Sequence, residues 1–517
     1  MKIKIKHLSY EKVAALPRAE HQKPHKPSLL FRTLLRVVCT PDLWATRFRC
    51  RRIGMEKLGR REPCLILMNH SSFIDLKIAS VVLYPRPFHI VCTADGMVGK
   101  KWLMRRLGCI PTQKYVPDMR LVKDMVYATR KNKCSVLMYP EAGYSFDGTA
   151  TPIPDTLGSC VKLLGVPVVM IRAEGAFARD PLYNNLQLRR VKVSAEMEYL
   201  LSPEQIKAMS PADINAVLKE QFSFDYFRWQ KEKGVKIKEK FRADCLNRVL
   251  YRCPHCGTEG QMEGRGIHLT CHACGKMWEL TEVGEMRALA GETEFPHIPD
   301  WYRWERQNVR REIEAGEYSL DVPVDIYMLI DTKALYRVGE GRLEHNAEGF
   351  HLTGCEGKLD YRQKPLASYS LNADYYWYEI GDVIGIGNTD VLYYCFPKNA
   401  GDVVAKTPIH RIAANAYEYI NEHYAEDCSL HRIAAALHVS PNHLHTVFSR
   451  EVGQTPLACV MQCRVHRAKR LIAAGEKSMQ EIALEVGFCS QSHFNKVFKE
   501  HTGETPASYR RRLVERY

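Results

Sequence analysis

The chain has 517 residues, of which 45% are hydrophobic and 26% are charged, and its formal net charge is +15. This length exceeds what a single hydrophobic core supports, so we expect three or four globular domains. The composition excludes membrane-spanning segments, because no apolar run approaches the length of a transmembrane helix. The positive charge favours a polyanionic partner, either anionic lipid headgroups or nucleic acid.

The cysteines indicate a reducing compartment. All but two pairs of the 18 cysteines are scattered, and residues 1–26 are basic but lack the apolar core of a secretory signal peptide. We therefore expect free thiols in the cytoplasm rather than disulfides.

Residues 1–60 form a basic N-terminal segment with an amphipathic stretch at 27–54. Leu30, Leu34 and Val38 are among the residues of its apolar face, and six arginines supply positive charge. One interpretation is an anchor in peripheral contact with anionic lipid on the inner face of the cell membrane. The other is a helix packed on its own domain with a solvated arginine face.

Residues 61–249 alternate short apolar runs with helical stretches, which predicts an α/β domain with a mixed or mostly parallel sheet. The candidate strands are 64–68, 88–92, 135–139, 166–171 and 191–195.

The first of these strands leads through a polar turn into a helix, for which Ser72 is the expected N-cap. His70 would lie at the carboxyl end of the strand, where open α/β sheets place reacting groups, and Asp75 could reach back to it. Such a carboxylate holds the imidazole while the imidazole takes a proton from a hydroxyl. The same residues also fit a plain capping box, Ser72-x-x-Asp75, with His70 as an ordinary turn residue.

Four sequence blocks in order resemble a known family of enzymes. The stretch Asn69–Asp75 resembles the His-x4-Asp block of the glycerolipid acyltransferases of the lysophosphatidate type. The stretches Gly108–Lys114, Tyr139–Ser145 and Gly165–Met170 resemble the second, third and fourth blocks of that family. The resemblance covers roughly residues 30–230.

This resemblance implies an O-acyltransferase. His70 would deprotonate an acceptor hydroxyl, Asp75 would orient the imidazole, and the hydroxyl would attack the thioester of acyl-CoA or acyl carrier protein. The implied acceptor is a lysophospholipid of the 1-acylglycerol-3-phosphate type. The implied substrate-binding residues are Ser71, Lys114, Glu141 and Ser145.

The third block departs from the family pattern at two positions. Ala142 and Tyr144 stand where the family has glycine and arginine, and Lys114 replaces an arginine in the second block. The third-block arginine is associated with the phosphate of the acceptor, and a phenol cannot supply its bidentate, permanently charged fork. These departures support an alternative in which the acyltransferase-like domain is a non-catalytic lipid sensor.

Two Cys-x2-Cys pairs in residues 250–280 predict a zinc ribbon. Cys253, Cys256, Cys271 and Cys274 carry the ligand spacing of a four-thiolate site, with fourteen residues between the pairs. A closed shell of four thiolates leaves no open position, so the zinc would be structural.

Residues 281–316 are helical and charged, and we expect them to form a linker. Residues 317–400 contain short β-type runs separated by Gly, Asn and Asp, which predicts a small antiparallel sandwich or barrel. This β-rich domain shows no recognisable site chemistry.

Residues 405–517 contain two similar helix-turn-helix units, in which Ser440 and Ser490 are the expected caps of the second helices and Gly487 permits a tight turn. This pairing closely resembles the DNA-binding domain of the AraC/XylS regulators. The resemblance implies that the polar residues of the second helices face the major groove of double-stranded DNA. The candidates are Asn442, His443, His445, Thr446 and Ser449 in the first unit, and Gln491, Ser492, Asn495, Lys496 and Lys499 in the second. A helical protein-interaction module with a basic face is the alternative.

The sequence therefore predicts a multidomain cytoplasmic chain that joins an acyltransferase to a sequence-specific transcription regulator. The alternative is an AraC-type regulator that has lost the acyl-transfer chemistry.

Overall fold

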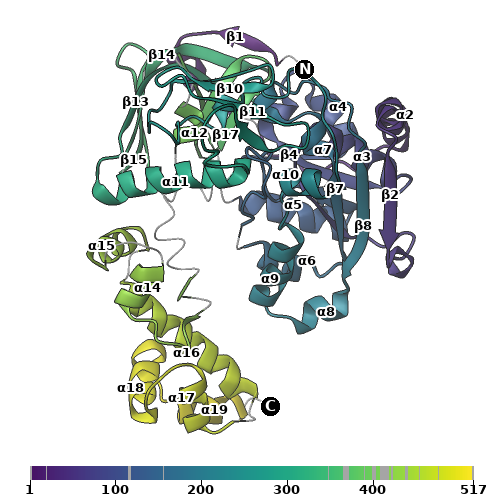
Figure 1. Cartoon of the computed structure of the whole chain (residues 1–517). Helices are drawn as coiled ribbons and strands as arrows, with labels where there is room; N and C mark the ends of the chain where they lie inside the picture. Colours follow the sequence, from purple (N-terminus) through teal and green to yellow (C-terminus); the bar gives the residue numbers. More distant parts are fainter. Residues whose placement is uncertain are drawn as a thin grey trace. The chain divides into compact units, whose positions relative to one another are not determined.

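The computed structural model describes residues 3–18, 20–114, 118–154, 156–346, 348–364, 372–388, 390–398, 403–407, 419–420, 423–436, 441–452, 455–474 and 477–514. The chain divides into two compact units (Figure 1). The first comprises Met1–Arg310 and Ser319–Pro408, and the second comprises Arg311–Tyr318 and Ile409–Tyr517.

The first unit contains a seven-stranded α/β sheet with the order β2-β8-β7-β3-β6-β4-β5. Neighbouring strands are parallel except β7 and β8, which confirms the mixed, mostly parallel sheet. The strands are β2 (Arg49–Ile53), β3 (Leu65–Met68), β4 (Phe88–Thr93), β5 (Cys109–Thr112), β6 (Ser135–Met138), β7 (Val168–Glu174) and β8 (Ser194–Leu201).

Helices pack on both faces of this sheet. They include α2 (Leu29–Ala45), α3 (Ile74–Val82), α4 (Lys101–Arg106), α5 (Met119–Arg130), α6 (Leu157–Leu164), α7 (Ala176–Arg179), α8 (Pro203–Ala208), α9 (Pro211–Gln221) and α10 (Tyr226–Glu232). Ile66 and Met68 of β3 join the core beneath α3, while Leu65 and Leu67 join the core beneath α5 and α6. Both faces of β3 are buried, which is why this strand is a continuous apolar run.

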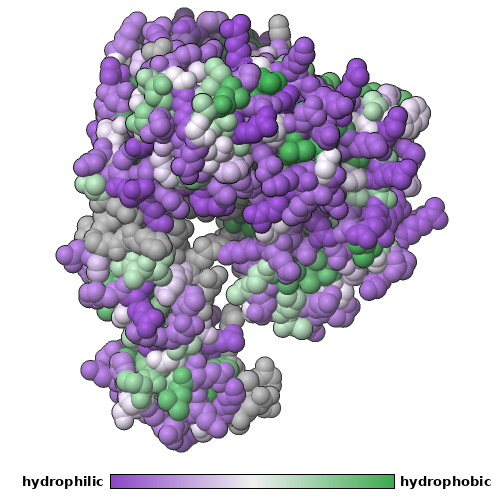
Figure 2. All heavy atoms as spheres, viewed as in Figure 1, coloured by the Kyte–Doolittle hydropathy of each residue, from purple (hydrophilic) through white to green (hydrophobic). Residues whose placement is uncertain are grey.

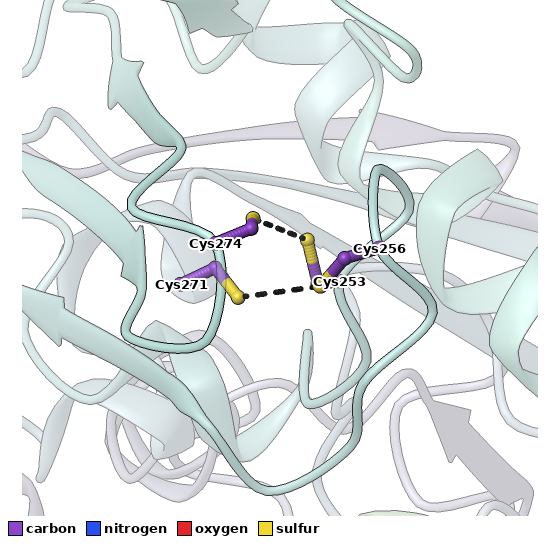
Figure 3. Close-up of side chains that lie close together, drawn as sticks. All are labelled: Cys253, Cys256, Cys271 and Cys274. Atoms are coloured by element: carbon purple, nitrogen blue, oxygen red, sulfur yellow. Dashed lines mark hydrogen bonds between the residues drawn. The ribbon is translucent and has the colours of Figure 1, made fainter.

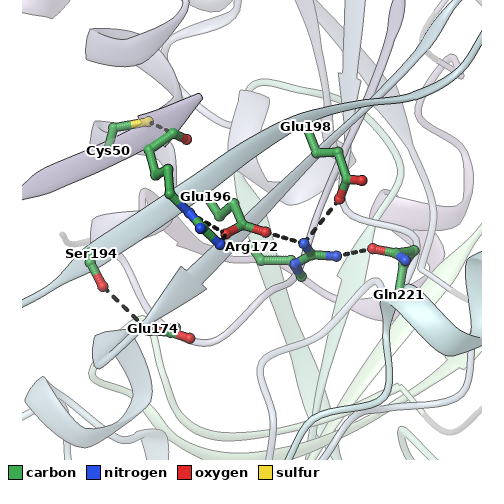
Figure 4. Close-up of polar contacts among 8 residues, drawn as sticks. Cys50, Arg172, Glu174, Ser194, Glu196, Glu198 and Gln221 are labelled. Atoms are coloured by element: carbon green, nitrogen blue, oxygen red, sulfur yellow. Dashed lines mark hydrogen bonds and ion pairs between the residues drawn. The ribbon is translucent and has the colours of Figure 1, made fainter. Parts of the chain in front are cut away.

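Polar contacts connect three neighbouring strands at the β2 side of the same sheet (Figure 4). Arg172 of β7 contacts Glu196 and Glu198 of β8 and also Gln221, and Arg51 of β2 donates to Glu196 over 2.8 Å. Strand β2 comes from the segment that we expected to be a separate basic N-terminal part. Part of that segment is therefore integral to the α/β sheet.

The β-rich part forms an eight-stranded sheet with the order β16-β15-β14-β13-β19-β18-β17, and β1 pairs in parallel with β14. Its strands are β1 (Ile5–His7), β13 (Leu320–Leu329), β14 (Leu335–Asn346), β15 (Gly349–Gly354), β16 (Leu359–Gln363), β17 (Asn372–Trp377), β18 (Gly381–Gly387) and β19 (Leu392–Pro397). Apart from β1, neighbouring strands are antiparallel, as predicted. Short helices α1 (Tyr10–Ala14) and α12 (Val403–Lys406) belong to the same unit.

A small four-stranded antiparallel sheet carries the two cysteine pairs, with the order β12-β11-β10-β9. Its strands are β9 (Met262–Arg265), β10 (His268–Cys271), β11 (Met277–Leu280) and β12 (Met286–Ala288). Helix α11 (Ile298–Ala315) packs against it, because the rings of Trp278 and Trp301 meet at 5.1 Å and Trp301 donates to the carbonyl of Arg252. The segment expected to be a linker is therefore largely ordered and packed.

The second unit is all-helical where it is described. Its helices are α14 (Leu430–Ala436), α15 (Pro441–Val452), α16 (Pro456–Ala474), α17 (Met479–Glu485), α18 (Gln491–Thr502) and α19 (Pro506–Val514). Ser490 caps α18 by accepting from the backbone of His493, whereas Ser440 lies outside the described residues. Gly487 adopts φ +90°, and any Cβ there would collide with the backbone of Ala425. Among the described helices of the chain, none has the length and apolar character required to cross a bilayer.

Candidate functional sites

The first candidate site lies at the carboxyl end of β3. His70 Nδ1 lies 3.1 Å from Asp75 Oδ2, and the side chain of His70 is 21% exposed while that of Asp75 is fully buried. Because a carboxylate accepts, Nδ1 is assigned the proton, and Nε2 is the nitrogen left for a substrate. The geometry is that of a general base held by a carboxylate.

The carboxylate of Asp75 is fixed by the turn that carries His70. Its Oδ2 also accepts hydrogen bonds from the backbone of Ser71 at 2.6 Å and of Ser72 at 3.0 Å. Helix α3 begins at Ile74, and the residue before it, Phe73, already has helical backbone angles (φ −61°, ψ −19°). Ser72 Oγ accepts from the backbone of Ile74 at 3.2 Å, which is the hydrogen bond expected of an N-cap at Ser72. The side chains of Ser72 and Asp75 share the free amides at this helix end, because Asp75 accepts from Ser71 and Ser72 while Ser72 accepts from Ile74. The capping arrangement and the histidine pairing therefore coexist.

Glu141 connects the first block to the third. Its two oxygens accept from the backbone of His70 at 2.8 Å and of Thr151 at 2.9 Å. Burial raises the pKa of Glu141 to about 8, against the opposing effect of the two backbone donors. Glu141 is fully buried, so in this structure it positions the histidine loop and is not open to a ligand.

A second set of polar contacts holds the other side of the loop. Asn69 donates to the carbonyl of Ala173 at 3.0 Å and to the hydroxyl of Tyr226 at 2.5 Å. The same hydroxyl contacts Ser71 Oγ. Ser145 donates from its backbone to the carbonyl of His70 at 3.2 Å. Ser71 and Ser145, which we expected to bind substrate, are both buried and used within the fold.

Two tyrosines of the third block enclose the imidazole. The ring of His70 lies 4.2 Å from that of Tyr139 and 4.3 Å from that of Tyr144. Burial, and then the nearby charge of Asp75, raise the pKa of both phenols well above the usual range, so both stay protonated. A neutral ring thus packs beside the imidazole, at the sequence position where the family has an arginine.

Ala142, at the position where the family has glycine, adopts a backbone conformation that favours glycine. Its φ is +56°, in the left-handed region that favours glycine. The turn of the third block is therefore preserved at a steric cost of roughly 1–2 kcal/mol.

Lys114 of the second block is paired with a residue of the β-rich part. Its Nζ lies 2.6 Å from Oδ2 of Asp374 on β17, and the two side chains are 15% and 8% exposed. Burial alone would lower the pKa of Lys114, but the charges of Asp374 and Asp95 raise it overall. Nothing in the sequence pattern indicated Asp374, because it lies in a domain without any matched block.

The second candidate site is a cluster of four cysteines (Figure 3). The Sγ atoms of Cys253, Cys256, Cys271 and Cys274 all lie within 4.8 Å of one another. Cys253 and Cys271 are buried, and Cys256 and Cys274 are exposed. Gly257 and Gly275, which follow the two cysteine pairs, have φ of +76° and +74°, in the left-handed region that favours glycine. The cluster could bind one metal ion.

The third candidate site is the surface of the second helices of the paired unit. In α18, Gln491, Ser492, Lys496 and Lys499 are exposed and Asn495 is half-buried, while Phe494 and Phe498 enter the core. In α15, Asn442 and His445 are exposed and Ser449 is half-buried. The side chains of His443 and Thr446 lie outside the described part of the structure. The described polar candidates of α18 thus lie on the face opposite its packing residues.

Helix α2 presents an apolar outer surface. Cys39 and Leu43 are buried against the domain, whereas Leu30, Val38 and Trp44 are 64%, 74% and 76% exposed. Hydrophilic side chains cover most of the face seen in Figure 2.

Comparison with known proteins identifies two of these parts. Residues 49–173 match the family model described as acyltransferase, and residues 433–512 match the model described as helix-turn-helix domain. A solved structure of the acyltransferase PlsC from Thermotoga maritima covers 37% of this chain and 76% of that chain, with 14% identity and a TM-score of 0.31.

The other relatives match the C-terminal part. The bifunctional transcriptional activator/DNA repair enzyme AdaA of Bacillus subtilis is 37% identical over 18% of this chain and 44% of that protein. The raffinose operon regulatory protein RafR of Pediococcus pentosaceus is 29% identical over 19% of this chain and 35% of that protein. The DNA-binding domain of AdpA, solved with a target DNA, is 28% identical over 20% of this chain and 94% of that chain, with a TM-score of 0.20. The chain thus spans less than half the length of these two curated relatives.

The first unit therefore contains an acyltransferase-family domain, and the second is an AraC-type helix-turn-helix domain. The chain as a whole is a fusion of these two domains, with a four-cysteine cluster and an antiparallel β sheet in the same polypeptide.

Proposed function

We propose that the first unit is an O-acyltransferase that moves an acyl group from acyl-CoA or acyl carrier protein to the hydroxyl of a lysophospholipid-like acceptor. The observation that carries this proposal is the contact between His70 Nδ1 and the buried carboxylate of Asp75. The family resemblance implies an acceptor of the 1-acylglycerol-3-phosphate type.

In this proposal, His70 Nε2 takes the proton of the acceptor hydroxyl, and the oxygen attacks the carbonyl carbon of the thioester. The tetrahedral intermediate collapses, the C–S bond breaks, and the imidazolium returns the proton to the thiolate. Asp75 stabilises the imidazolium between these steps. Glu141 and Asn69 keep the loop in place through backbone contacts.

The test is thiol release from oleoyl-CoA with a panel of lysolipid acceptors, using full-length protein. We expect His70→Ala to reduce acceptor-dependent release by at least about a hundredfold. His501→Ala, which removes an exposed histidine from the DNA-binding domain, is the matched control and should leave the rate unchanged. Equal rates for wild type and His70→Ala would rule out the enzyme.

We propose that the second unit binds a specific double-stranded DNA operator and regulates transcription. The described polar face of α18 supports this, as does the AdpA domain that was solved with a target DNA. Binding to a selected operator should exceed binding to scrambled DNA at physiological salt, because binding driven by counterion release alone shows no sequence preference.

We further propose that the four-cysteine cluster holds a structural zinc ion. Four thiolates at this spacing suit tetrahedral zinc and leave no position for a substrate. Metal analysis should give about one zinc per chain, and fewer after Cys253→Ser.

Helix α2 supports a proposal of peripheral contact with anionic membrane. Its exposed apolar residues share the helix with arginines such as Arg36, which is exposed and whose guanidinium stacks over Tyr84, and apolar and basic residues together are the combination expected at a lipid interface. Flotation with vesicles of phosphatidylcholine and phosphatidylglycerol should recover the wild type, and Val38→Glu with Trp44→Glu should abolish recovery.

The alternative function is a regulator whose acyltransferase-like domain only senses lipid. The neutral ring of Tyr144 beside His70 is the observation in its favour. Under this alternative, lysolipid would change the affinity for the operator, and His70→Ala would not alter that change.

A further inference from the structure

Strand β17 of the β-rich sheet packs directly onto the acyltransferase site. Besides the pair of Lys114 with Asp374, the rings of Phe146 and Tyr375 meet at 4.8 Å. Phe146 lies only two residues beyond Tyr144, whose ring packs on His70. The β-rich sheet therefore reaches the loop that encloses the imidazole.

The β17–β18 turn is anchored at its sides. Tyr378 donates to Asp95 at 2.9 Å, and Arg248 lies 3.1 Å from Asp382. Tyr376, near the end of β17, and Tyr378, in the turn, adopt φ of +51° and +48°, which is costly for tyrosine. A strained turn is retained where the surrounding contacts fix it, and such turns cluster at functional sites.

The charges of Lys114 and Asp374, which we call the polar wall of the site, do not suit a phosphate group on the acceptor. Lys114 is the basic residue of the second block, and its ammonium is already neutralised by Asp374, with Asp95 also close enough to raise its pKa. Tyr144 stands in place of a permanent cation. A phosphate dianion brought beside Lys114 would have to displace or face the carboxylate of Asp374, and like charges at such contact are strongly unfavourable.

We infer that β17 forms the acceptor side of the acyltransferase site and that Asp374, by holding Lys114, selects a hydroxyl acceptor whose headgroup carries no phosphate monoester. The polar wall formed by Lys114 and Asp374 can accept from and donate to hydroxyl groups, so a neutral polyol headgroup fits it. This inference rests on the proposed acyl transfer, and it replaces the phosphate-bearing acceptor that the family resemblance implies with a neutral one. Asp374 is then a specificity residue, while proton transfer stays with His70.

The first experiment compares 1-oleoylglycerol with 1-oleoylglycerol 3-phosphate as acceptors for the full-length protein, with oleoyl-CoA as donor. The wild type should prefer the neutral acceptor in kcat/KM. Asp374→Asn should shift the ratio toward the phosphate by about tenfold or more, because the ammonium of Lys114 becomes available. A wild type that prefers the phosphate acceptor, or an Asn variant with an unchanged ratio, would overturn the inference.

Two variants separate the freed ammonium from a loosened site. The double variant Lys114→Gln with Asp374→Asn removes both charges and should not gain activity on the phosphate acceptor. Asp321→Asn breaks an exposed ion pair with Arg342 in the same sheet and should behave like the wild type. A phosphate gain in either variant would show that the shift does not come from Lys114. The preference of the wild type between the two acceptors is measured without any variant. It therefore tests the inference even if Asp374→Asn misfolds.

A binding measurement distinguishes failure of the inference from failure of the enzyme. Calorimetry with soluble 1-hexanoylglycerol 3-phosphate should show about tenfold tighter binding to Asp374→Asn than to wild type. This shift without any acylation would contradict the proposed enzyme and leave the selectivity of the wall supported. Equal binding, or binding to neither protein, would overturn the inference even if acylation is observed.

Discussion

Replacing Asp75 by Asn and by Ala should separate the chemistry from the stability of the histidine loop. The carboxylate accepts from the backbone of Ser71 and Ser72 and from His70 Nδ1, all through Oδ2. In Asp75→Asn the amide oxygen can take the place of Oδ2, so the backbone donors keep an acceptor. The negative charge that stabilises the imidazolium is lost. We therefore expect kcat to fall by about 10²–10⁴-fold with little change in the melting temperature.

Asp75→Ala removes the acceptor as well as the charge. Two buried backbone donors lose their partner, at about 1–3 kcal/mol each, so the free energy of unfolding should fall by roughly 2–6 kcal/mol. The assay is thiol release from oleoyl-CoA, with denaturant unfolding of the same preparations. If the Asn variant retains full activity, or loses as much stability as the Ala variant, this account of the loop is wrong.

Three further outcomes follow from the other sites. Removal of metal from the cysteine cluster by a chelator, or the substitution Cys274→Ser, should lower the melting temperature of the first unit. The operator affinity of the second unit should stay unchanged, and a parallel loss of operator binding would contradict this prediction. Lys496→Ala should weaken binding to all DNA sequences and reduce the salt slope by about one, whereas Gln491→Ala should cost about 1–3 kcal/mol at one operator position only. In the folded protein the pKa of Glu141, about 8, lies above the ordinary value for a glutamate. The stability that Glu141 contributes in its protonated form should therefore be lost as pH rises from 5 to 8. Thermal unfolding of Glu141→Gln should depend less on pH in that range. A wild-type melting temperature that rises over this interval would contradict the assigned direction.

The sequence was sufficient where chemistry and local structure share one short stretch. The apolar run of β3 and the turn around His70 predicted the strand, the edge of the sheet and the pairing with Asp75. The spacing of the two cysteine pairs likewise predicted that the four thiols lie together, because ligand spacing is a local property of the sequence.

Contacts between distant parts of the chain could not be predicted in this way. Asp374 reaches Lys114 from a strand that carries no motif, and Tyr226 supports Asn69 and Ser71 from a helix outside the four matched blocks. A carboxylate or a phenol in an alternating strand or an amphipathic helix has many possible partners, and only tertiary packing chooses among them. The roles expected for Ser71, Glu141 and Ser145 remain predictions about a substrate complex, since all three serve the fold in this structure.

The pairing of Ile5 with Leu335 has a consequence for how this polypeptide is made. Strand β1 belongs to a sheet whose remaining strands are synthesised only after the acyltransferase and cysteine-rich parts. During translation β1 has no partner until β13 and β14 have been synthesised, and closure of so long a loop is slow. A cut after His7 that removes the acyltransferase part would therefore also separate β1 from its partner strand β14.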